Sequence, residues 1–133
     1  MQGDETFRFQ TNAPAPEEAI SALLEILGKS PPEEYLAFLR MASGGEGFAG
    51  DEYVMLWRCE DLIEYNQRYQ VEELAPGFFL IGSNGGGEAY GFNLSSGSSN
   101  LYQLPFIGME SQYANKVVDS FDLFLAGIAS AKS

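Results

Sequence analysis

The chain has 133 residues, of which 45% are hydrophobic and 14% aromatic, and its 19 acidic and 7 basic residues give a formal net charge of −12. This composition excludes a disordered chain and predicts a single domain over residues 1–133, with about 14 peripheral residues at the N-terminus. The shortage of Lys and Arg argues against binding to nucleic acid or to anionic membranes. An acidic surface favours solubility and equally favours a basic protein partner, and composition leaves both open.

The chain contains no histidine and one cysteine, Cys59. The absence of histidine removes Ser-His and Cys-His dyads and most zinc sites, and a lone cysteine cannot form an internal disulfide. The N-terminus has no signal-peptide core, and no apolar run approaches the roughly 20 residues of a membrane span. We therefore expect a cytoplasmic protein, or one that is secreted only as part of something larger.

The first third of the chain predicts one strand and two helices. Phenylalanines that alternate with polar residues predict a strand over residues 6–10. Apolar residues at helical spacing predict a helix between Pro16 and Gly28. The Ser-Pro-Pro-Glu motif at 30–33 reads as a capping box that begins a second helix, which glycines end from residue 44 onward.

The middle of the chain alternates between loops, a strand and a helix. Residues 46–52 combine glycines with carboxylates and predict an exposed acidic loop. An apolar strand follows at 53–57, and a third helix is expected from about residue 60 to residue 69. Ala-Pro-Gly at 75–77 predicts a turn.

The last part predicts an antiparallel meander and a final helix. Its strands span 78–82, 88–94 and 100–104, and a short strand is expected at 117–118. Asp119 or Ser120 caps a terminal helix with an apolar stripe. Helices at both ends of a run of strands predict an α+β fold with a central, mostly antiparallel sheet and packed helices.

The glycine run of Gly85, Gly86 and Gly87 between two of these strands predicts a structural turn. A phosphate-binding loop would need Lys and Ser or Thr after the last glycine, but Glu88 and Ala89 follow. A dinucleotide-binding loop would begin a helix, whereas this one begins a strand. The run therefore indicates no nucleotide site.

No residue pattern specifies catalysis, a cofactor or a metal. Cys59 has Arg58 beside it, but Glu60 and Asp61 make its surroundings acidic, so a reactive thiolate is not expected. Carboxylate pairs such as Asp51 and Glu52 could bind a divalent cation or cleave a sugar, but their spacing is not diagnostic. We expect no enzyme and no metal site, and a metal-dependent enzyme that uses carboxylates is the alternative from another class.

Six features follow one another along roughly residues 15–128: the N-terminal helix, the proline-rich helix start, Tyr35-Leu36-Ala37-Phe38-Leu39 before Gly44-Gly45, Leu56-Trp57 with the following helix, the segment Ile81 to Leu94, and Val118 to Leu125. In this order and spacing they resemble the SUKH superfamily, also called the Smi/Knr-type domain. No single motif is specific, and the resemblance rests on their order and spacing together.

The resemblance implies an α+β fold and protein binding without catalysis. Many bacterial members are immunity proteins that neutralise toxin domains, often nucleases, and fungal relatives regulate through protein contacts. An acidic inhibitor complements a basic nuclease face. We therefore expect a toxin or nuclease domain as the partner, with an intracellular regulatory or scaffold module as the alternative. The partner-binding candidates are Glu46, Asp51, Glu52 and Glu88, with Tyr53 and Tyr90 as anchors.

Overall fold

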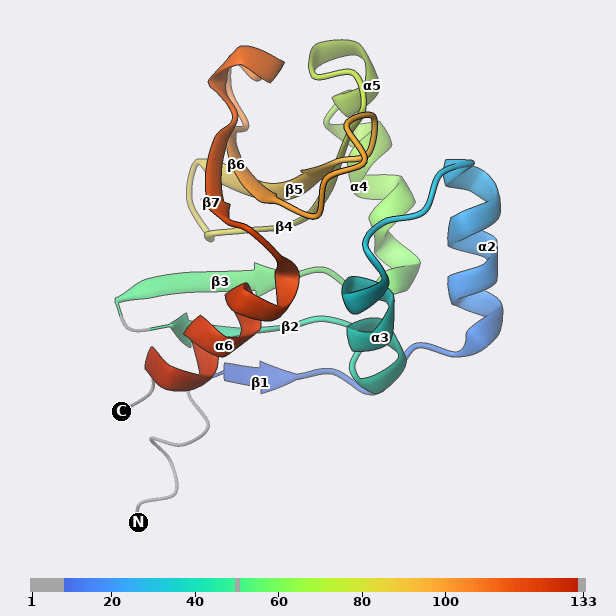
Figure 1. The fold of residues 1–133 in the computed structure, drawn as a ribbon, viewed down its shortest axis with the longest axis vertical. Coiled ribbons are helices and arrows are strands. Elements are labelled where there is room, and N and C mark those ends of the chain that lie inside the picture. The colour runs from blue at the N-terminus through green and yellow to red at the C-terminus, as the bar shows by residue number, and fades with distance from the viewer. Residues whose placement is uncertain (1–8, 50, 132–133) are drawn as a thin grey trace.

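The computed structural model describes residues 9–49 and 51–131. Within these residues, seven strands form one antiparallel sheet in chain order, so that each strand lies beside its neighbours in the sequence (Figure 1). The strands are β1 (Phe9–Thr11), β2 (Gly45–Ala49), β3 (Glu52–Leu56), β4 (Phe78–Ser83), β5 (Glu88–Asn93), β6 (Leu101–Pro105) and β7 (Asn115–Val118).

The helices pack around this sheet at its ends and on its faces. They are α2 (Glu17–Leu27), α3 (Glu33–Met41), α4 (Leu62–Arg68), α5 (Val71–Leu74) and α6 (Phe121–Ala131), with short 3₁₀ turns η1 (Cys59–Asp61) and η2 (Ser111–Tyr113). In Figure 1, α6 crosses in front of β2, and it contacts β2, β7 and α3. Helix α4 contacts β4 and α5. The result is the α+β fold that the sequence predicts.

The sheet is narrowest where β3 meets β4. These strands pair at only two positions, Met55 with Ser83 and Leu56 with Gly82, whereas β4 and β5 pair at five. A Cβ atom at Gly82 would lie 2.2 Å from the Met55 carbonyl oxygen, so only glycine permits this approach. Because the two strands are staggered, residues 52–54 of β3 extend beyond one end of β4, and residues 78–80 of β4 extend beyond β3.

The side chain of Asn66, on α4, binds the backbone of the part of β4 that β3 does not reach. The Leu80 N–H donates to Asn66 Oδ1 at 2.8 Å, and Asn66 Nδ2 donates to the Leu80 carbonyl oxygen at 2.9 Å. The same Nδ2 donates to the Leu62 carbonyl oxygen at 2.8 Å. One amide thus supplies the donor and the acceptor that a neighbouring strand would offer, and it fixes α4 against the sheet.

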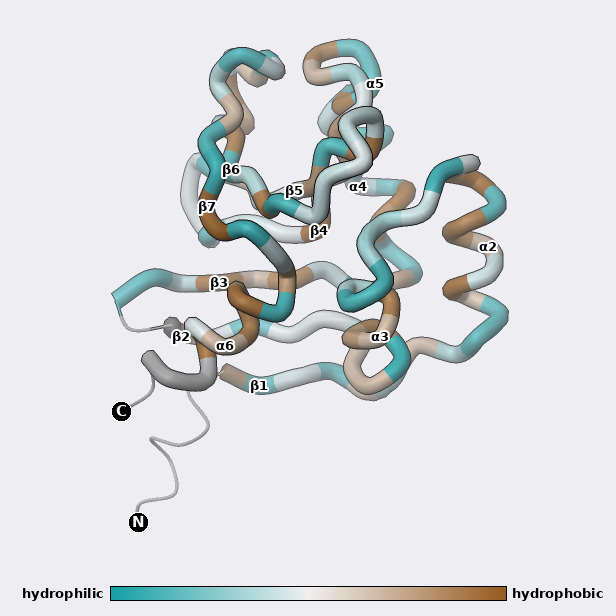
Figure 2. Tube along the Cα trace, viewed as in Figure 1, coloured by the Kyte–Doolittle hydropathy of each residue, from teal (hydrophilic) through white to brown (hydrophobic). Residues whose placement is uncertain are grey.

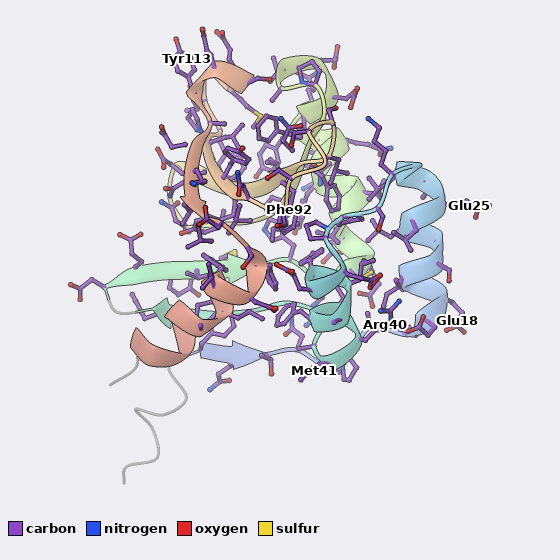
Figure 3. All side chains as sticks on the ribbon, viewed as in Figure 1. Glu18, Glu25, Arg40, Met41, Phe92 and Tyr113 are labelled. Atoms are coloured by element: carbon purple, nitrogen blue, oxygen red, sulfur yellow. The ribbon has the colours of Figure 1, made fainter. Side chains whose placement is uncertain are left out.

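Aromatic side chains from α3, α6 and β5 make the centre of the core. The ring of Tyr35 lies 5.5 Å from Phe92 and 5.1 Å from Phe121, and Phe38 lies 5.3 Å from Phe121. Figure 2 shows hydrophilic residues in the outer loops and at the tip of the β2–β3 hairpin. Phe92 lies in the interior in Figure 3, whereas Glu18, Glu25, Met41 and Tyr113 point outward and Arg40 reaches toward Glu17 of α2.

The acidic loop predicted over residues 46–52 is wrong. Residues 45–49 form β2, and Glu52 begins β3, so the segment is a hairpin of the sheet. Gly45 permits a close backbone contact, because a Cβ there would lie 2.4 Å from the Gln10 carbonyl oxygen of β1. In the sequence, a glycine that allows two paired strands to approach closely cannot be told from a glycine of a loop.

The predicted capping box at 30–33 is also wrong. Helix α3 begins after Pro32 without a side-chain cap, and the Ser30 hydroxyl donates to the Pro31 carbonyl oxygen instead. The Glu34 carboxylate accepts the Phe121 N–H of α6 at 2.9 Å, while the Ser120 hydroxyl accepts the Leu123 N–H at 3.2 Å. Glu34 therefore caps a helix 87 residues away, a contact that local sequence cannot indicate.

Other element boundaries shift by a few residues. The expected helix over 60–69 is η1 followed by α4, and the sequence did not indicate α5. The first strand spans 9–11, and residues 6–8 of the predicted strand lie outside the described residues. The terminal helix and the β4–β5–β6 meander lie where the sequence predicts them.

Candidate functional site

The predicted partner-binding residues gather at one end of the sheet but divide between its two faces. On β2 and β3, side chains alternate between faces, so Glu46 and Tyr53 share one face. The Tyr53 hydroxyl donates a hydrogen bond to a Glu46 carboxylate oxygen. This hydrogen bond, with smaller contributions from desolvation and the Glu46 charge, raises the pKa of Tyr53.

The opposite face carries Glu52, Glu88 and Tyr90. The ring of Tyr90 packs 5.3 Å from Phe124 of α6, and Tyr90 is only 4% exposed. Burial raises the pKa of its hydroxyl, and the charges of Glu52 and then Glu88 raise it further. Carboxylates from β3 and β5 therefore act on one hydroxyl. Asp51 lies exposed in the turn between β2 and β3.

The turn between β4 and β5 holds the predicted glycine run, and its backbone is fixed by Asn84. The Asn84 carboxamide oxygen accepts the N–H groups of Gly86 at 2.9 Å and Glu88 at 3.2 Å. Gly85 has a left-handed φ of 78°, and a Cβ there would lie 2.8 Å from the Tyr53 ring. Gly86 and Gly87 have neither restriction. The turn is structural, and one of its three glycines is required by backbone conformation.

An apolar groove of about 200 Å³ lies beside α6, next to Glu52. We call it the α6 groove. Its lining includes Val54, Tyr90, Val117, Leu123, Phe124 and Gly127. Three of these come from α6 and the others from β3, β5 and β7. The groove therefore lies where residues 52–54 of β3 extend beyond β4, on the face that carries Glu52 and Tyr90.

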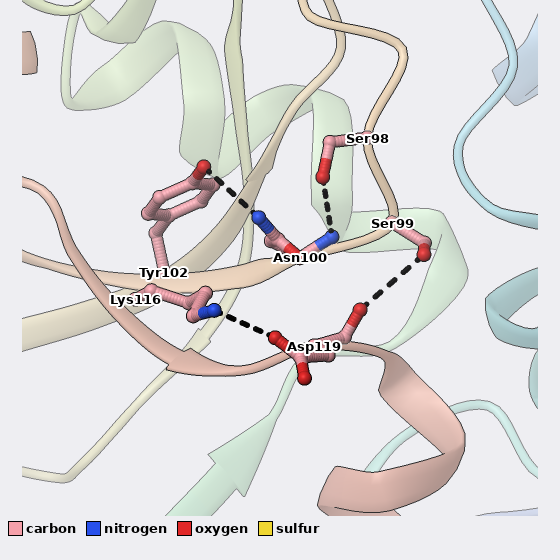
Figure 4. Close-up of polar contacts among 6 residues, drawn as sticks. All are labelled: Ser98, Ser99, Asn100, Tyr102, Lys116 and Asp119. Atoms are coloured by element: carbon pink, nitrogen blue, oxygen red, sulfur yellow. Dashed lines mark hydrogen bonds and ion pairs between the residues drawn. The ribbon is translucent and has the colours of Figure 1, made fainter.

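Hydrogen bonds that join β7 and the β5–β6 loop to Asp119, between β7 and α6, hold one wall of the groove (Figure 4). Lys116 Nζ lies 2.7 Å from an Asp119 carboxylate oxygen, and the Ser99 hydroxyl donates to the Asp119 carbonyl oxygen at 3.3 Å. The hydrogen bond to Asp119 and the charge of that carboxylate raise the pKa of Lys116. Lys116 precedes the groove residue Val117 in the sequence, and its ammonium group is paired with Asp119, just after the end of β7.

The acidic groups at this end of the sheet have no basic partner among the described residues. Ion pairs in the described ranges join Arg40 to Glu17 and Glu33, Arg68 to Glu64, and Lys116 to Asp119. Glu46, Asp51, Glu52 and Glu88 take part in none of them. Their charges are available to an external cation, and exposed carboxylates act mainly on the rate of encounter.

A second cavity, of about 330 Å³, lies between α2, α4, α5 and β4. Its wall includes Ile26 and Asn66, but the Asn66 amide already binds the backbone of Leu80. Gln70, with a left-handed φ of 56°, also lines it. None of the predicted partner-binding residues lines this cavity, so the α6 groove is the stronger candidate.

Cys59 is buried, and the described residues contain no cluster of carboxylates suited to a metal ion. Cys59 is 4% exposed, and burial, with the Glu60 charge, raises the pKa of its thiol to about 11. The thiol is therefore protonated at neutral pH. In the described ranges, no group of three His, Cys, Asp or Glu residues could hold a metal ion, and no helix has the length and apolarity to cross a membrane.

Sequence reasoning missed the residues that give the groove its shape. Val54 reads as core, and Val117 as part of a short strand. Gly127 is the one residue with a usable signal, because it interrupts an otherwise apolar helical pattern at 121–128.

Comparison with known proteins agrees with this fold. Residues 14–127 match the model of the SMI1 / KNR4 family (SUKH-1). A relative described as uncharacterized protein YnaB, from Bacillus subtilis (strain 168), is 38% identical over 79 residues, which are 59% of this chain and 49% of the relative. The chain thus spans about half the length of that relative. Because the family model matches most of the chain, the chain belongs to the SMI1/KNR4 (SUKH-1) family.

Proposed function

We propose that this chain is a non-catalytic protein-binding domain that acts in the cytoplasm as an immunity protein. It covers the basic, substrate-binding face of a toxin domain, such as a nuclease, and thereby blocks access to that face. The observation that carries this proposal is the set of exposed or half-buried carboxylates at the β2–β3 tip and the α6 groove, which have no basic partner among the described residues. The net charge of −12 favours the same kind of partner.

The buried, protonated Cys59 thiol supports binding without catalysis, as does the family membership. A nuclease holds phosphates through a basic surface, so an acidic protein can occupy that surface by long-range attraction followed by close contact. The half-buried Tyr53 supplies aromatic area beside Glu46, and aromatic residues are frequent in binding hot spots, whereas Tyr90 is buried against Phe124.

The test begins with affinity capture from the native lysate at low and at physiological salt, and with mass spectrometry of what binds. Growth rescue follows: the captured protein is expressed alone and together with this chain. The proposal requires a basic toxin whose expression stops growth and whose effect this chain abolishes. A captured cellular complex that salt does not weaken, without toxicity, would contradict it and would favour a regulatory or scaffold module.

The contribution of the acidic tip is tested with purified partner by measuring association rates across salt concentrations. The variant Asp51→Lys/Glu52→Lys is compared with Glu18→Lys/Glu25→Lys on the outer side of α2, which changes the net charge equally. At low salt we expect the tip variant to associate about tenfold more slowly, and the control to change much less. Equal slowing of both would show that net charge alone acts.

A further inference from the structure

The α6 groove lies beside a part of β3 that β4 does not pair with. Residues 52–54 of β3 extend past the end of β4, since the pairing of the two strands stops at Met55 and Ser83. Helix α6 contacts β2 and β7, and between it and this part of β3 lies the groove of about 200 Å³. Leu123, on the α6 wall, is 53% exposed although its neighbour Phe124 is buried. The groove thus presents apolar surface to an incoming group.

Gly127 lines the groove on α6, and because it has no side chain it leaves space there. A Cβ added there would meet no atom of the described residues within 4 Å, and the φ of Gly127 is not left-handed. Neither crowding nor backbone conformation therefore explains a glycine at this place. Glycine inside a helix is less stable than alanine. Its effect here is to leave room in the groove for a side chain from elsewhere.

The charge beside the groove selects the kind of side chain that fits. Glu52 lines the groove, and Glu88 lies on the same face of β5 as Tyr90. Both carboxylates are close enough to the Tyr90 hydroxyl to raise its pKa, after the larger effect of burial. Lys116 does not neutralise them, because Asp119 holds its ammonium group.

A long aliphatic stem that ends in a cation matches an apolar floor with an acidic rim. We propose that the α6 groove binds an Arg or Lys side chain of the partner protein, with its stem against Val54 and Leu123 and its charge at Glu52 and Glu88. This inference rests on the proposed function in taking a basic protein as the partner. It adds the place of contact and the side chain that makes it.

The first experiment uses peptides as probes, so that it does not depend on identifying the partner. Acetyl-leucyl-arginyl-leucine amide is titrated into ¹⁵N-labelled protein and followed by NMR. The matched probe replaces arginine with norleucine, which keeps an aliphatic stem and removes the cation. We expect the arginine peptide to shift the amide signals of Val54, Tyr90 and Gly127 at millimolar concentrations, and the norleucine peptide to leave them unchanged.

The protein variant that tests the groove is Gly127→Leu, which fills it. The matched control is Ala22→Leu, which adds similar bulk to an exposed position on α2. Thermal unfolding confirms that both variants fold. We expect Gly127→Leu to weaken arginine-peptide binding by at least about tenfold, and Ala22→Leu to bind as the unmodified protein does.

Three results would overturn the proposal: equal shifts with both peptides, no shifts up to about 20 mM peptide, or shifts centred on Ile26 and Ile63 in the second cavity. With a purified toxin partner, the two proposals separate. Full neutralisation by Gly127→Leu would retain the function and reject the groove. Arginine binding in the groove, together with failure to neutralise any captured toxin, would retain the groove and reject the function.

Discussion

At each end of the β3–β4 pairing, one strand extends past the other, and the two extensions differ in whether another group of the protein covers them. Residues 78–80 of β4 extend past β3, and there the Asn66 amide binds both backbone groups of Leu80. Residues 52–54 of β3 extend past β4, and there the α6 face of the sheet remains a groove with Glu52 at its rim. We call residues 78–80 the closed end, because the Asn66 side chain makes the hydrogen bonds that a neighbouring strand would make. We call residues 52–54 the open end, because a groove lies beside them.

This difference separates stability from binding within one sheet. Polar groups at the closed end are paired inside the protein, so their loss costs folding free energy. Carboxylates at the open end lack described basic partners, so their loss changes what the protein attracts and leaves the fold intact. Substitutions at the two ends should therefore affect different measurements.

The largest effect is expected at the junction between the two ends. Gly82→Ala places a Cβ 2.2 Å from the Met55 carbonyl oxygen, and both atoms belong to paired backbones that cannot move apart without breaking the sheet. We expect a loss of more than about 3 kcal/mol in the free energy of unfolding, measured by denaturant titration. Gly87→Ala, where a Cβ meets nothing within 4 Å, is the control and should change it by less than about 0.5 kcal/mol.

At the closed end, Asn66→Ala removes three hydrogen bonds and leaves the Leu80 N–H and carbonyl groups without their partner. We expect destabilisation by about 2–3 kcal/mol. Gln67→Ala, at the exposed neighbouring position, should have little effect. Hydrogen exchange at the Leu80 amide gives a local readout. An Asn66→Ala protein that kept full protection at Leu80 would contradict the assigned role.

At the open end, two glycines should respond with opposite signs. In Gly127→Ala the added methyl group meets no described atom, and alanine is more stable than glycine inside a helix. We therefore expect this substitution to stabilise the protein by about 0.5–1 kcal/mol. Gly85→Ala meets a left-handed φ and the Tyr53 ring, so it should lower the Tm. If Gly127→Ala lowered the Tm as well, Gly127 would serve packing, and the groove would lose its clearest feature.

Much of this fold can be predicted from local patterns, because the spacing of apolar residues differs between helices and strands. The meander from β4 to β6 and the stripe of α6 are examples. The β2 strand was missed because Gly45 and Gly47 remove the alternating side chains by which a strand is recognised, and the reason for Gly45 is the approach of β1. The Glu34 cap on α6 depends on two segments 87 residues apart, which no local pattern can join.

For the candidate site, the sequence named individual residues but not their arrangement. Sequence placed Glu52 among the candidates because loops beside a sheet edge are accessible, and it named Tyr90 as an anchor, although Tyr90 is only 4% exposed. It could not tell that Glu46 and Tyr53 lie on the other face, since that depends on the β2–β3 register. The groove needed the β3–β4 stagger and the position of α6, which are tertiary features.

The smallest predicted effect tests the electrostatics of the open end without changing its shape. The pKa of Tyr90 lies above its ordinary value of 10.0 through burial and the charges of Glu52 and Glu88. Glu52→Gln removes one of those charges, so the pKa of Tyr90 should fall, measured by NMR of ¹³Cζ-labelled tyrosine. Glu25→Gln, on the exposed side of α2, is the control and should leave it unchanged.

The sign for stability follows from the same shift. Because the folded state raises the pKa of Tyr90, its neutral hydroxyl favours folding below pH 10, the unfolded value, and this contribution is lost as the pH rises through the folded value. Glu52→Gln should reduce that loss, since the folded phenolate then meets less negative charge. An unchanged pKa of Tyr90 in Glu52→Gln would place Glu52 too far from the hydroxyl to form an acidic rim, and the open end would then be an apolar groove without selectivity for a cation.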